Sequence, residues 1–323
     1  MVVEETRLLA AAQKDEESFR RLTGPHCGAL HLHCYRMLGS VDDADDALQE
    51  TLLRAWRSLD RFEPRAPFGA WLHRIATNVC LTMLAGRRRR QEVPLADPGK
   101  DAWNERLLHL QPYPDHLLDE LERRETVQLA FVTAAQLLPP KQRAVLILRD
   151  VLDWSAKETA ETLGDSVAAV NSSLQRARAG LERARGLGAP PHLAGDTASE
   201  KALLKHFMVA WDRVDVDGIV SLLARDAIMA MPPEPFFVKG SEAIGEFFRT
   251  VPLGGRLDRI RLVPTAANRQ PALAAYAWEE DAGEHRAYGV MVFAFDGSAI
   301  SGIVGFADAT VFSRFALPER TVP

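Results

Sequence analysis

Five polar side chains share one face of a predicted helix near the middle of the chain. They are Asn171, Ser172, Gln175, Arg176 and Arg178. Asparagine and glutamine amides can pair with adenine edges in the major groove of DNA, and arginine can pair with guanine or a phosphate. The opposite face has apolar residues at helical spacing, namely Val170, Leu174, Ala177 and Leu181. This pattern predicts a helix that packs by one side and contacts DNA by the other.

The residues before this helix provide the elements that would position it. Ser155 is followed three residues later by Glu158, which predicts a capping box at the start of a shorter helix. Gly164 fits the turn between the two helices, and Ser166 can cap the second one. Residues 138–181 therefore predict a helix-turn-helix. A surface helix hairpin in an ordinary bundle is the alternative, because charged helix faces are often only solvated.

Charge is distributed unevenly along the first hundred residues. The chain has 323 residues and a net charge of −5, so binding to nucleic acid must depend on local patches. Residues 61–90 contain seven arginines and one acid, Glu63, whereas acids are concentrated between residues 42 and 50. This separation predicts one surface for an anionic partner and a neighbouring surface for a basic partner.

The composition indicates a soluble globular protein of two or three domains. We expect a cytoplasmic protein with no membrane partner, because no apolar run reaches about 18 residues and the first residues lack a signal-peptide layout. Cys27, Cys34 and Cys80 are expected to be reduced thiols. Histidines lie near the first two, but the spacing is not that of a metal site, so we expect no metal and no cofactor.

Apolar periodicity divides the chain into five segments. Residues 1–92 form a predicted all-α domain, and the proline-rich residues 93–116 form a predicted linker. Within this linker, Trp103 and Tyr113 are expected to pack against another surface, because large aromatic side chains are seldom left fully exposed. Residues 117–186 form a second all-α domain with the helix-turn-helix, followed by a linker at 187–198. Residues 199–323 form an α+β domain.

The α+β domain is predicted to place helices first and antiparallel strands afterwards. The strands are expected at 260–264, 273–278, 287–295 and 300–311, with a turn at Asp296-Gly297. A sheet wrapped around a helix commonly encloses a pocket, which is a candidate for a small-molecule ligand. The residue types that could act as a base or proton donor there are Asp226, Glu234, Glu279, His285 and Tyr288. None lies in a recognisable catalytic motif, so we expect no enzyme activity.

Several separated motifs resemble those of the extracytoplasmic-function (ECF) sigma factors of bacterial RNA polymerase. The motifs are Cys34-Tyr-Arg-Met-Leu-Gly-Ser40, Asp46-Ala-Leu-Gln-Glu50, Ala55-Trp56, Trp71-Leu-His-Arg-Ile-Ala-Thr-Asn78, Gln111-Pro-Tyr-Pro-Asp115 and Leu138-Pro-Pro-Lys-Gln-Arg143. More narrowly, the chain resembles the subgroup with a C-terminal SnoaL-like domain of the NTF2 fold. The resemblance implies a non-enzymatic transcription initiation factor whose partners are core RNA polymerase and promoter DNA.

The resemblance also implies roles for individual residues. The contact with the coiled coil of the largest polymerase subunit would involve Asp45, Leu48, Gln49, Glu50 and Leu53. The −10 promoter element would be melted and held by Phe62, Arg65, Phe68, Trp71, Arg74, Asn78, Arg87 and Arg88. The −35 element would be contacted by Asn171, Ser172, Gln175, Arg176 and Arg178, in the domain that also meets the polymerase flap. Thr82 and Ala85 depart from the family pattern, so the −10 specificity of relatives does not transfer directly.

The resemblance implies that the linker runs along the polymerase cleft towards the RNA exit path. The covalent tether and the pocket-forming pattern favour a regulatory role for the C-terminal domain, which would dock on the sigma domains or on the linker, set their spacing and so modulate activity. Two other functions fit parts of the sequence. One is a one-component helix-turn-helix regulator with a ligand-sensing domain, and the other is a SnoaL-type isomerase or cyclase with a helical appendage.

Overall fold

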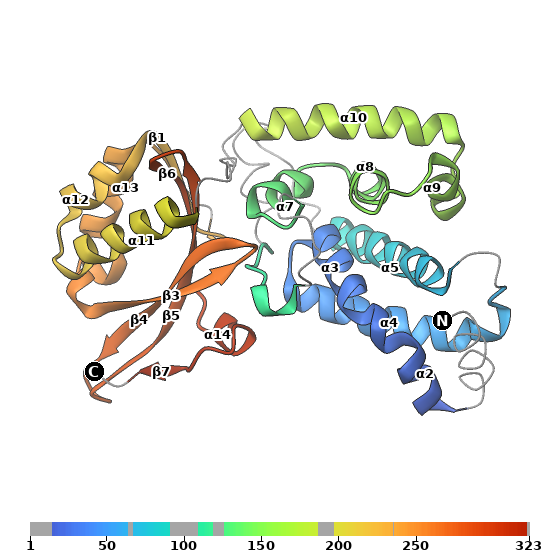
Figure 1. Ribbon diagram of the computed structural model, residues 1–323, viewed down its shortest axis with the longest axis horizontal. Helices are drawn as coiled ribbons and strands as arrows, with labels where there is room; N and C mark the ends of the chain where they lie inside the picture. The colour runs from blue at the N-terminus through green and yellow to red at the C-terminus, as the bar shows by residue number, and fades with distance from the viewer. Residues whose placement is uncertain are drawn as a thin grey trace. The chain divides into compact units, whose positions relative to one another are not determined.

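The computed structural model describes residues 15–63, 67–90, 109–118, 126–186, 197–234 and 236–321 (Figure 1). These residues form two compact units. The first contains the described residues up to Arg90 together with Leu138–Gly180, and the second contains those from residue 109 to Leu137 together with Leu181 onward. Residues 126–137, which we placed in the helix-turn-helix domain, thus group with the sheet. No helix in the described ranges is long and apolar enough to cross a membrane.

The N-terminal part of the first unit is all-α, as predicted, and four α-helices lie within its described residues. They are α2 (Glu16–Thr23), α3 (Cys27–Leu38), α4 (Val41–Ser58) and α5 (Phe68–Arg90). Gly39 ends α3 in the left-handed region at a φ of 77°, and the Ser40 side chain then accepts a hydrogen bond from the Asp43 amide to cap α4. Fully buried side chains such as Tyr35 and Leu72 form the core between α3, α4 and α5.

The helix-turn-helix prediction is confirmed by α9 (Ala156–Leu163) and α10 (Val167–Gly186). The capping box of Ser155 and Glu158 is formed in both directions, and Gly164 has a φ of 64°. The Ser166 hydroxyl accepts a hydrogen bond from the Ala169 amide and so caps α10. The predicted apolar stripe of α10, from Val170 to Leu181, is buried.

Helix α8 (Pro140–Leu146) packs on α3 and α5, and a π-helical turn (Ile147–Val151) connects it towards α9. Arg143 of α8 is 4% exposed, and its guanidinium donates hydrogen bonds to the carbonyls of Met37 and Leu138. The buried arginine thus satisfies a carbonyl at the end of α3, where no helical partner remains for it, and a second one just before α8. The helix-turn-helix and the N-terminal helices thus belong to one unit.

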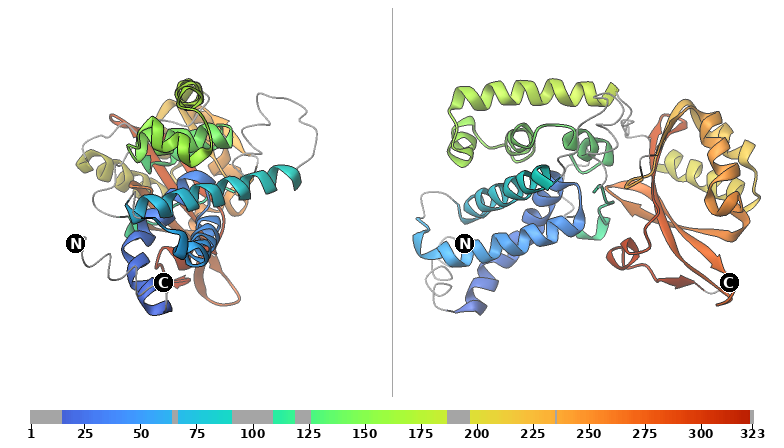
Figure 2. Two further views of the ribbon diagram at one scale, coloured as in Figure 1. Left: turned by 90° about the vertical axis from the view of Figure 1, so that its right-hand side faces the viewer. Right: turned by 180° about the vertical axis from the view of Figure 1, so that it is seen from behind.

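The second unit contains a curved mixed sheet (Figure 2). Its strands are β1 (Leu223–Ala230), β2 (Phe237–Lys239), β3 (Ile260–Ala267), β4 (Gln270–Glu279), β5 (Glu284–Asp296), β6 (Ala299–Phe306) and β7 (Arg320–Thr321). The order is β2-β1-β6-β5-β4-β3, and β7 pairs with β5. The four predicted strands correspond to β3 to β6, which pair antiparallel as expected, whereas β1, which was not predicted, pairs with β6 in parallel.

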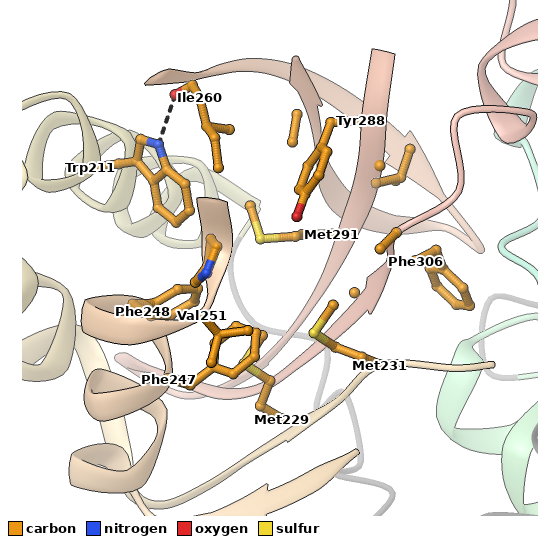
Figure 3. Close-up of a pocket in the computed structure, with 16 residues that line it drawn as sticks. Trp211, Met229, Met231, Phe247, Phe248, Val251, Ile260, Tyr288, Met291 and Phe306 are labelled. Carbon is orange, nitrogen blue, oxygen red and sulfur yellow. Dashed lines mark hydrogen bonds between the residues drawn. The ribbon is translucent and has the colours of Figure 1, made fainter. Parts of the chain in front are cut away.

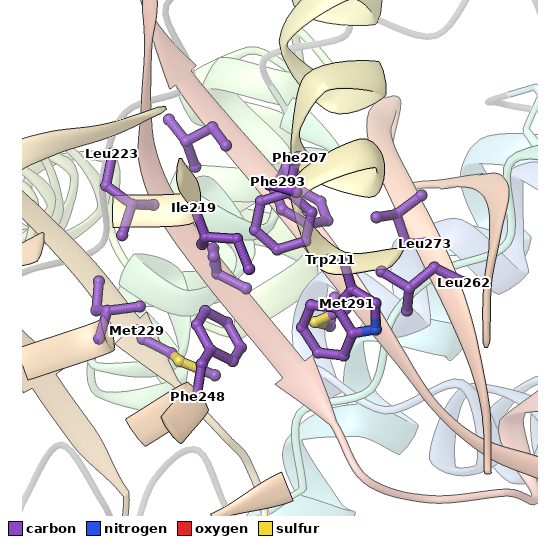
Figure 4. Close-up of a cluster of buried hydrophobic side chains, with 14 of the residues drawn as sticks. Phe207, Trp211, Ile219, Leu223, Met229, Phe248, Leu262, Leu273, Met291 and Phe293 are labelled. Atoms are coloured by element: carbon purple, nitrogen blue, oxygen red, sulfur yellow. The ribbon is translucent and has the colours of Figure 1, made fainter. Parts of the chain in front are cut away.

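Helices α11 (Thr197–Asp212), α12 (Val216–Leu222) and α13 (Ser241–Thr250) cover one face of this sheet (Figure 1). Their apolar sides meet the sheet in a core rich in aromatic rings (Figure 4). Phe207 packs on Phe293 with ring centroids 5.1 Å apart, and Trp211 packs on Phe248 at 5.4 Å. The Trp211 indole N–H donates to the Ile260 carbonyl at 2.9 Å, which fixes α11 to β3.

Two details of the predicted α+β domain were wrong. Residues 300–311 were expected to form one strand, but β6 ends at Phe306 and a short helix, α14, occupies Val311–Arg314. Asp308 stops the strand, because its carboxylate accepts hydrogen bonds from the Thr310 amide and hydroxyl in a tight turn. Strands β1 and β2 were missed, since only the short run after Asp226 is apolar.

Candidate nucleic-acid and polymerase interfaces

Helix α10 presents most of its predicted DNA-contacting residues to solvent. Asn171, Gln175 and Arg176 are exposed, and Ser172 is half-buried beside them. The Arg176 guanidinium donates to the hydroxyls of Ser172 at 2.6 Å and Ser173 at 3.1 Å, contacts that a DNA base or phosphate can replace. This arrangement provides two amides and one guanidinium on a single exposed face.

Arg178 differs from the other residues of this face. Its guanidinium makes two hydrogen bonds to the Asp150 carboxylate, at 2.9 and 2.7 Å. These hydrogen bonds and the adjacent negative charge raise the pKa of Arg178. Arg178 therefore connects α10 to the π-helical turn, and Arg176 is the freer of the two cations.

Helix α5 carries an exposed polar stripe. Arg74 and Asn78 are exposed one turn apart, and the Asn78 side-chain amide donates to the Arg74 carbonyl at 3.0 Å. Thr82 continues the stripe and donates to the Asn78 carbonyl at 2.8 Å. Arg74, Asn78 and Thr82 thus lie on one surface, where they can follow a nucleic-acid strand.

Three aromatic residues form a cluster at the start of α5. The Phe62 ring lies 5.4 Å from Phe68 and 5.1 Å from Trp71, and Phe68 lies 5.5 Å from Trp71. Phe68 is 1% exposed and belongs to the core, whereas Phe62 and Trp71 are half-buried and retain an accessible edge. Arg65 and the side chain of Arg88 lie outside the described residues. Arg87 forms an ion pair with Asp43 of α4.

Helix α4 presents a mixed apolar and polar surface. Leu53 is 41% exposed and Trp56 is 38% exposed, while Gln49 is exposed and Leu48 half-buried. Glu50 pairs with Arg54 at 2.6 Å, and Asp45 contacts the His31 imidazole at 3.1 Å. Leu53 and Trp56 lie three residues apart on one helix, so together they offer exposed apolar area to a protein partner. The exposed Trp56 is a further candidate for this contact, although in the sequence it stood out only as part of the Ala55-Trp56 motif.

Two models of known protein families match the parts of the chain that carry these surfaces. Residues 25–90 match the model for Sigma-70 region 2, and residues 128–181 match that for Sigma-70, region 4. The ECF RNA polymerase sigma factor SigG of Mycobacterium tuberculosis is 40% identical over 320 residues, covering 95% of this chain and 86% of SigG. The chain belongs to the ECF sigma factor family.

Two further relatives agree with this assignment. SigW of Bacillus subtilis is 30% identical over 182 residues, which cover 55% of this sigma factor and 94% of SigW. A crystal structure of the M. tuberculosis ECF sigma factor SigJ aligns with a TM-score of 0.61 at 22% identity, covering 91% of this chain and 98% of that one, and shows a shared fold. The sigma factor is a transcription initiation factor, and neither the one-component regulator nor the enzyme is favoured.

The sigma factor's linker docks on the turn between β3 and β4. We call Asn268, Arg269 and Gln270 the linker seat. The Tyr113 amide donates to Asn268 Oδ1, and the Asn268 amide donates back to the Tyr113 carbonyl, both at 2.8 Å. The Arg269 amide donates to the Asp115 carboxylate at 2.7 Å. Tyr113 is fully buried, which confirms that this aromatic residue docks, while Trp103 lies outside the described residues.

The linker seat also binds the segment that leads into α7 (Leu129–Gln136). The Asn268 side-chain amide donates to the Val127 carbonyl at 2.8 Å, and the Leu129 amide donates to Gln270 Oε1 at 2.8 Å. The Gln270 amide group in turn donates to the Phe293 carbonyl of β5 at 3.0 Å. Asn268 is fully buried and Gln270 is 3% exposed. Sequence reasoning missed both, and their amide chemistry beside a turn was the only signal.

A cavity lies between α13 and the sheet (Figure 3). It encloses about 510 Å³, part of it open to solvent, and Trp211, Phe247, Phe248 and three methionines contribute to its walls. Of the five candidate residues for a base or proton donor, only Tyr288 lines it. Asp226 and Glu234 are exposed, Glu279 pairs with Arg286 at 2.5 Å, and His285 packs on Trp278.

Proposed function

We propose that this sigma factor acts in the cytoplasm and uses three separate surfaces to start transcription. The α4 surface around Leu53 contacts core polymerase, the α5 stripe with Arg74 and Asn78 holds the −10 strand, and the exposed face of α10 contacts the −35 duplex. Each module is small, so specific binding depends on core polymerase supplying the remaining contacts.

We further propose that the C-terminal domain modulates initiation by retaining the linker. The observation that carries this proposal is the exchange of hydrogen bonds between Tyr113 and Asn268 in a buried setting. The resemblance implies that the linker follows the polymerase cleft in the holoenzyme. The proposal requires that the linker leave the seat when polymerase binds, so that its backbone can follow that path.

Run-off transcription with purified core polymerase tests the initiation role. The full chain, added to core enzyme and genomic fragments, is expected to confer defined start sites, and Asn171→Ala with Gln175→Ala is expected to reduce them. Core polymerase without the chain provides the baseline. Start sites that do not differ from this baseline would contradict the proposed function.

A further inference from the structure

We propose that the cavity between α13 and the sheet binds an uncharged, mainly apolar ring compound that carries one hydroxyl or carbonyl oxygen. The cavity lies wholly within the second unit and is lined by residues of α11, α13 and five strands. The space between these walls measures about 510 Å³, a figure that includes the part open to solvent. This binding site goes beyond the proposed role in initiation.

The walls of the cavity select for an apolar ring. Phe247, Phe248 and the Trp211 indole provide aromatic surfaces, and Met229, Met231 and Met291 provide thioethers around them (Figure 3). Methionine side chains adapt to irregular shapes and interact favourably with aromatic rings. The Trp211 N–H is already used, because it donates to the Ile260 carbonyl at 2.9 Å. The indole therefore offers a ligand only its apolar surface.

One polar side-chain group faces this space. The Tyr288 side chain comes from β5, and its hydroxyl points towards Met291 in the cavity (Figure 3). Within the described residues this hydroxyl has no hydrogen-bond partner. A phenol can donate to a carbonyl and can both donate to and accept from a hydroxyl. Tyr288 therefore fits a ligand with one such oxygen.

The lining disfavours a charged ligand. Among the described residues that line the cavity there is no carboxylate, ammonium, guanidinium or imidazole group. A charge moved from water into such a site would lose its hydration and gain no counter-charge. The ligand is therefore neutral, and its recognition depends on shape, apolar area and the single contact with Tyr288.

Calorimetric titration of the full chain with 2-naphthol tests the proposal, with naphthalene-2-sulfonate as the charged counterpart. We expect one site for 2-naphthol and at least about tenfold weaker binding of the sulfonate. Tyr288→Phe should weaken 2-naphthol binding about three- to tenfold by removing one hydrogen bond. Ala275→Leu, which fills the cavity from β4, should weaken it at least about tenfold. Ala282→Leu, in an exposed turn of the same domain, is the control and should bind normally.

The following results would overturn the proposal. They are no 2-naphthol binding up to about 1 mM, equal binding of the sulfonate, or undiminished binding by Tyr288→Phe. Full affinity of a folded Ala275→Leu chain would also overturn it. Where Ala275→Leu does not fold, the comparison of Tyr288→Phe with the wild type decides the result, because that change removes one oxygen and keeps the ring.

Discussion

The Asn268 backbone amide donates a hydrogen bond to the Tyr113 carbonyl, and the Asn268 side-chain oxygen accepts one from the Tyr113 amide. Asn268 achieves this at a φ of 56°, in the left-handed region that asparagine tolerates better than most residues. The NH₂ group of the same side chain donates a hydrogen bond to the Val127 carbonyl. Asn268 thus satisfies polar groups of Tyr113 in the linker and of Val127 in the segment that leads into α7.

Asn268→Gly should release the linker from its seat. Glycine keeps the left-handed backbone but leaves the Tyr113 amide and the Val127 carbonyl unsatisfied, at about 1–3 kcal/mol for each. We expect tighter binding to core polymerase and more transcription at limiting sigma factor, measured by core-binding titration and run-off assays. Ser298→Ala, in an exposed turn, is the control. Weaker core binding by Asn268→Gly would contradict the restraining role of the seat.

Arg176→Ala should reduce transcription from cognate promoters by about 1–3 kcal/mol equivalent, because this guanidinium is available to a base or phosphate. Core binding should be unchanged. Arg178→Ala provides the comparison, since its contact with Asp150 is an exposed ion pair worth at most about 1 kcal/mol to stability. Promoter titrations by both variants measure the difference. If only Arg178→Ala impaired promoter use, the assignment of the contacting arginine would be wrong.

Leu53→Asp should weaken binding to core polymerase without unfolding the chain. Leu53 is 41% exposed, so a carboxylate there remains hydrated in the free protein but would be buried in an interface. A loss of about tenfold or more in core affinity is expected by fluorescence titration. Asp60→Ala, at an exposed position after the same helix, is the control. Normal core affinity of Leu53→Asp would place the interface elsewhere.

Arg143→Met should destabilise the first unit by about 3 kcal/mol, because it leaves the buried carbonyls of Met37 and Leu138 without donors. Urea unfolding of this variant measures the loss. Arg57→Met removes an exposed arginine of similar size and should change stability little. A loss below about 1 kcal/mol for Arg143→Met would show that the carbonyls find other partners.

His33 should make the first unit less stable in mild acid. Burial lowers the pKa of His33 well below its usual value, and His73 and Arg36 lower it further. The unfolded chain therefore binds a proton below about pH 6.5 that the folded chain does not, and stability is lost as pH falls, by about 1 kcal/mol at pH 5.5. Urea unfolding at pH 7.5 and 5.5 should show a smaller loss in His33→Gln, which can retain the hydrogen bond to Thr77. Equal losses would refute this role.

The helices of the first unit could be predicted because their signals are local. The capping box at Ser155, the left-handed Gly164 and the buried stripe of α10 each depend on residues within a few turns of one another. Periodicity, caps and turns are properties of short segments, so a single sequence carries them. The same holds for the β5–β6 hairpin: Gly297 lies in its turn as expected, although the second turn residue is Ser298 and Asp296 ends β5.

The linker seat and the buried arginine could not be predicted, because their partners lie far away in the chain. Asn268 and Tyr113 are separated by 155 residues, and Arg143 and Met37 by 106. Nothing in the neighbourhood of Asn268 distinguishes it from an ordinary turn residue. The parallel pairing of β1 with β6 has the same origin, since its register depends on strands at opposite ends of the domain.

Strand β4 begins at Gln270, which holds the α7 segment, and contributes Ala275 to the cavity wall. One strand thus has one end at the linker seat and its middle at the cavity wall. By reciprocity, any compound that prefers the cavity of the released form would loosen the linker by the same factor by which release tightens its own binding. Binding of core polymerase to the released linker would then depend on the concentration of that compound in the cell.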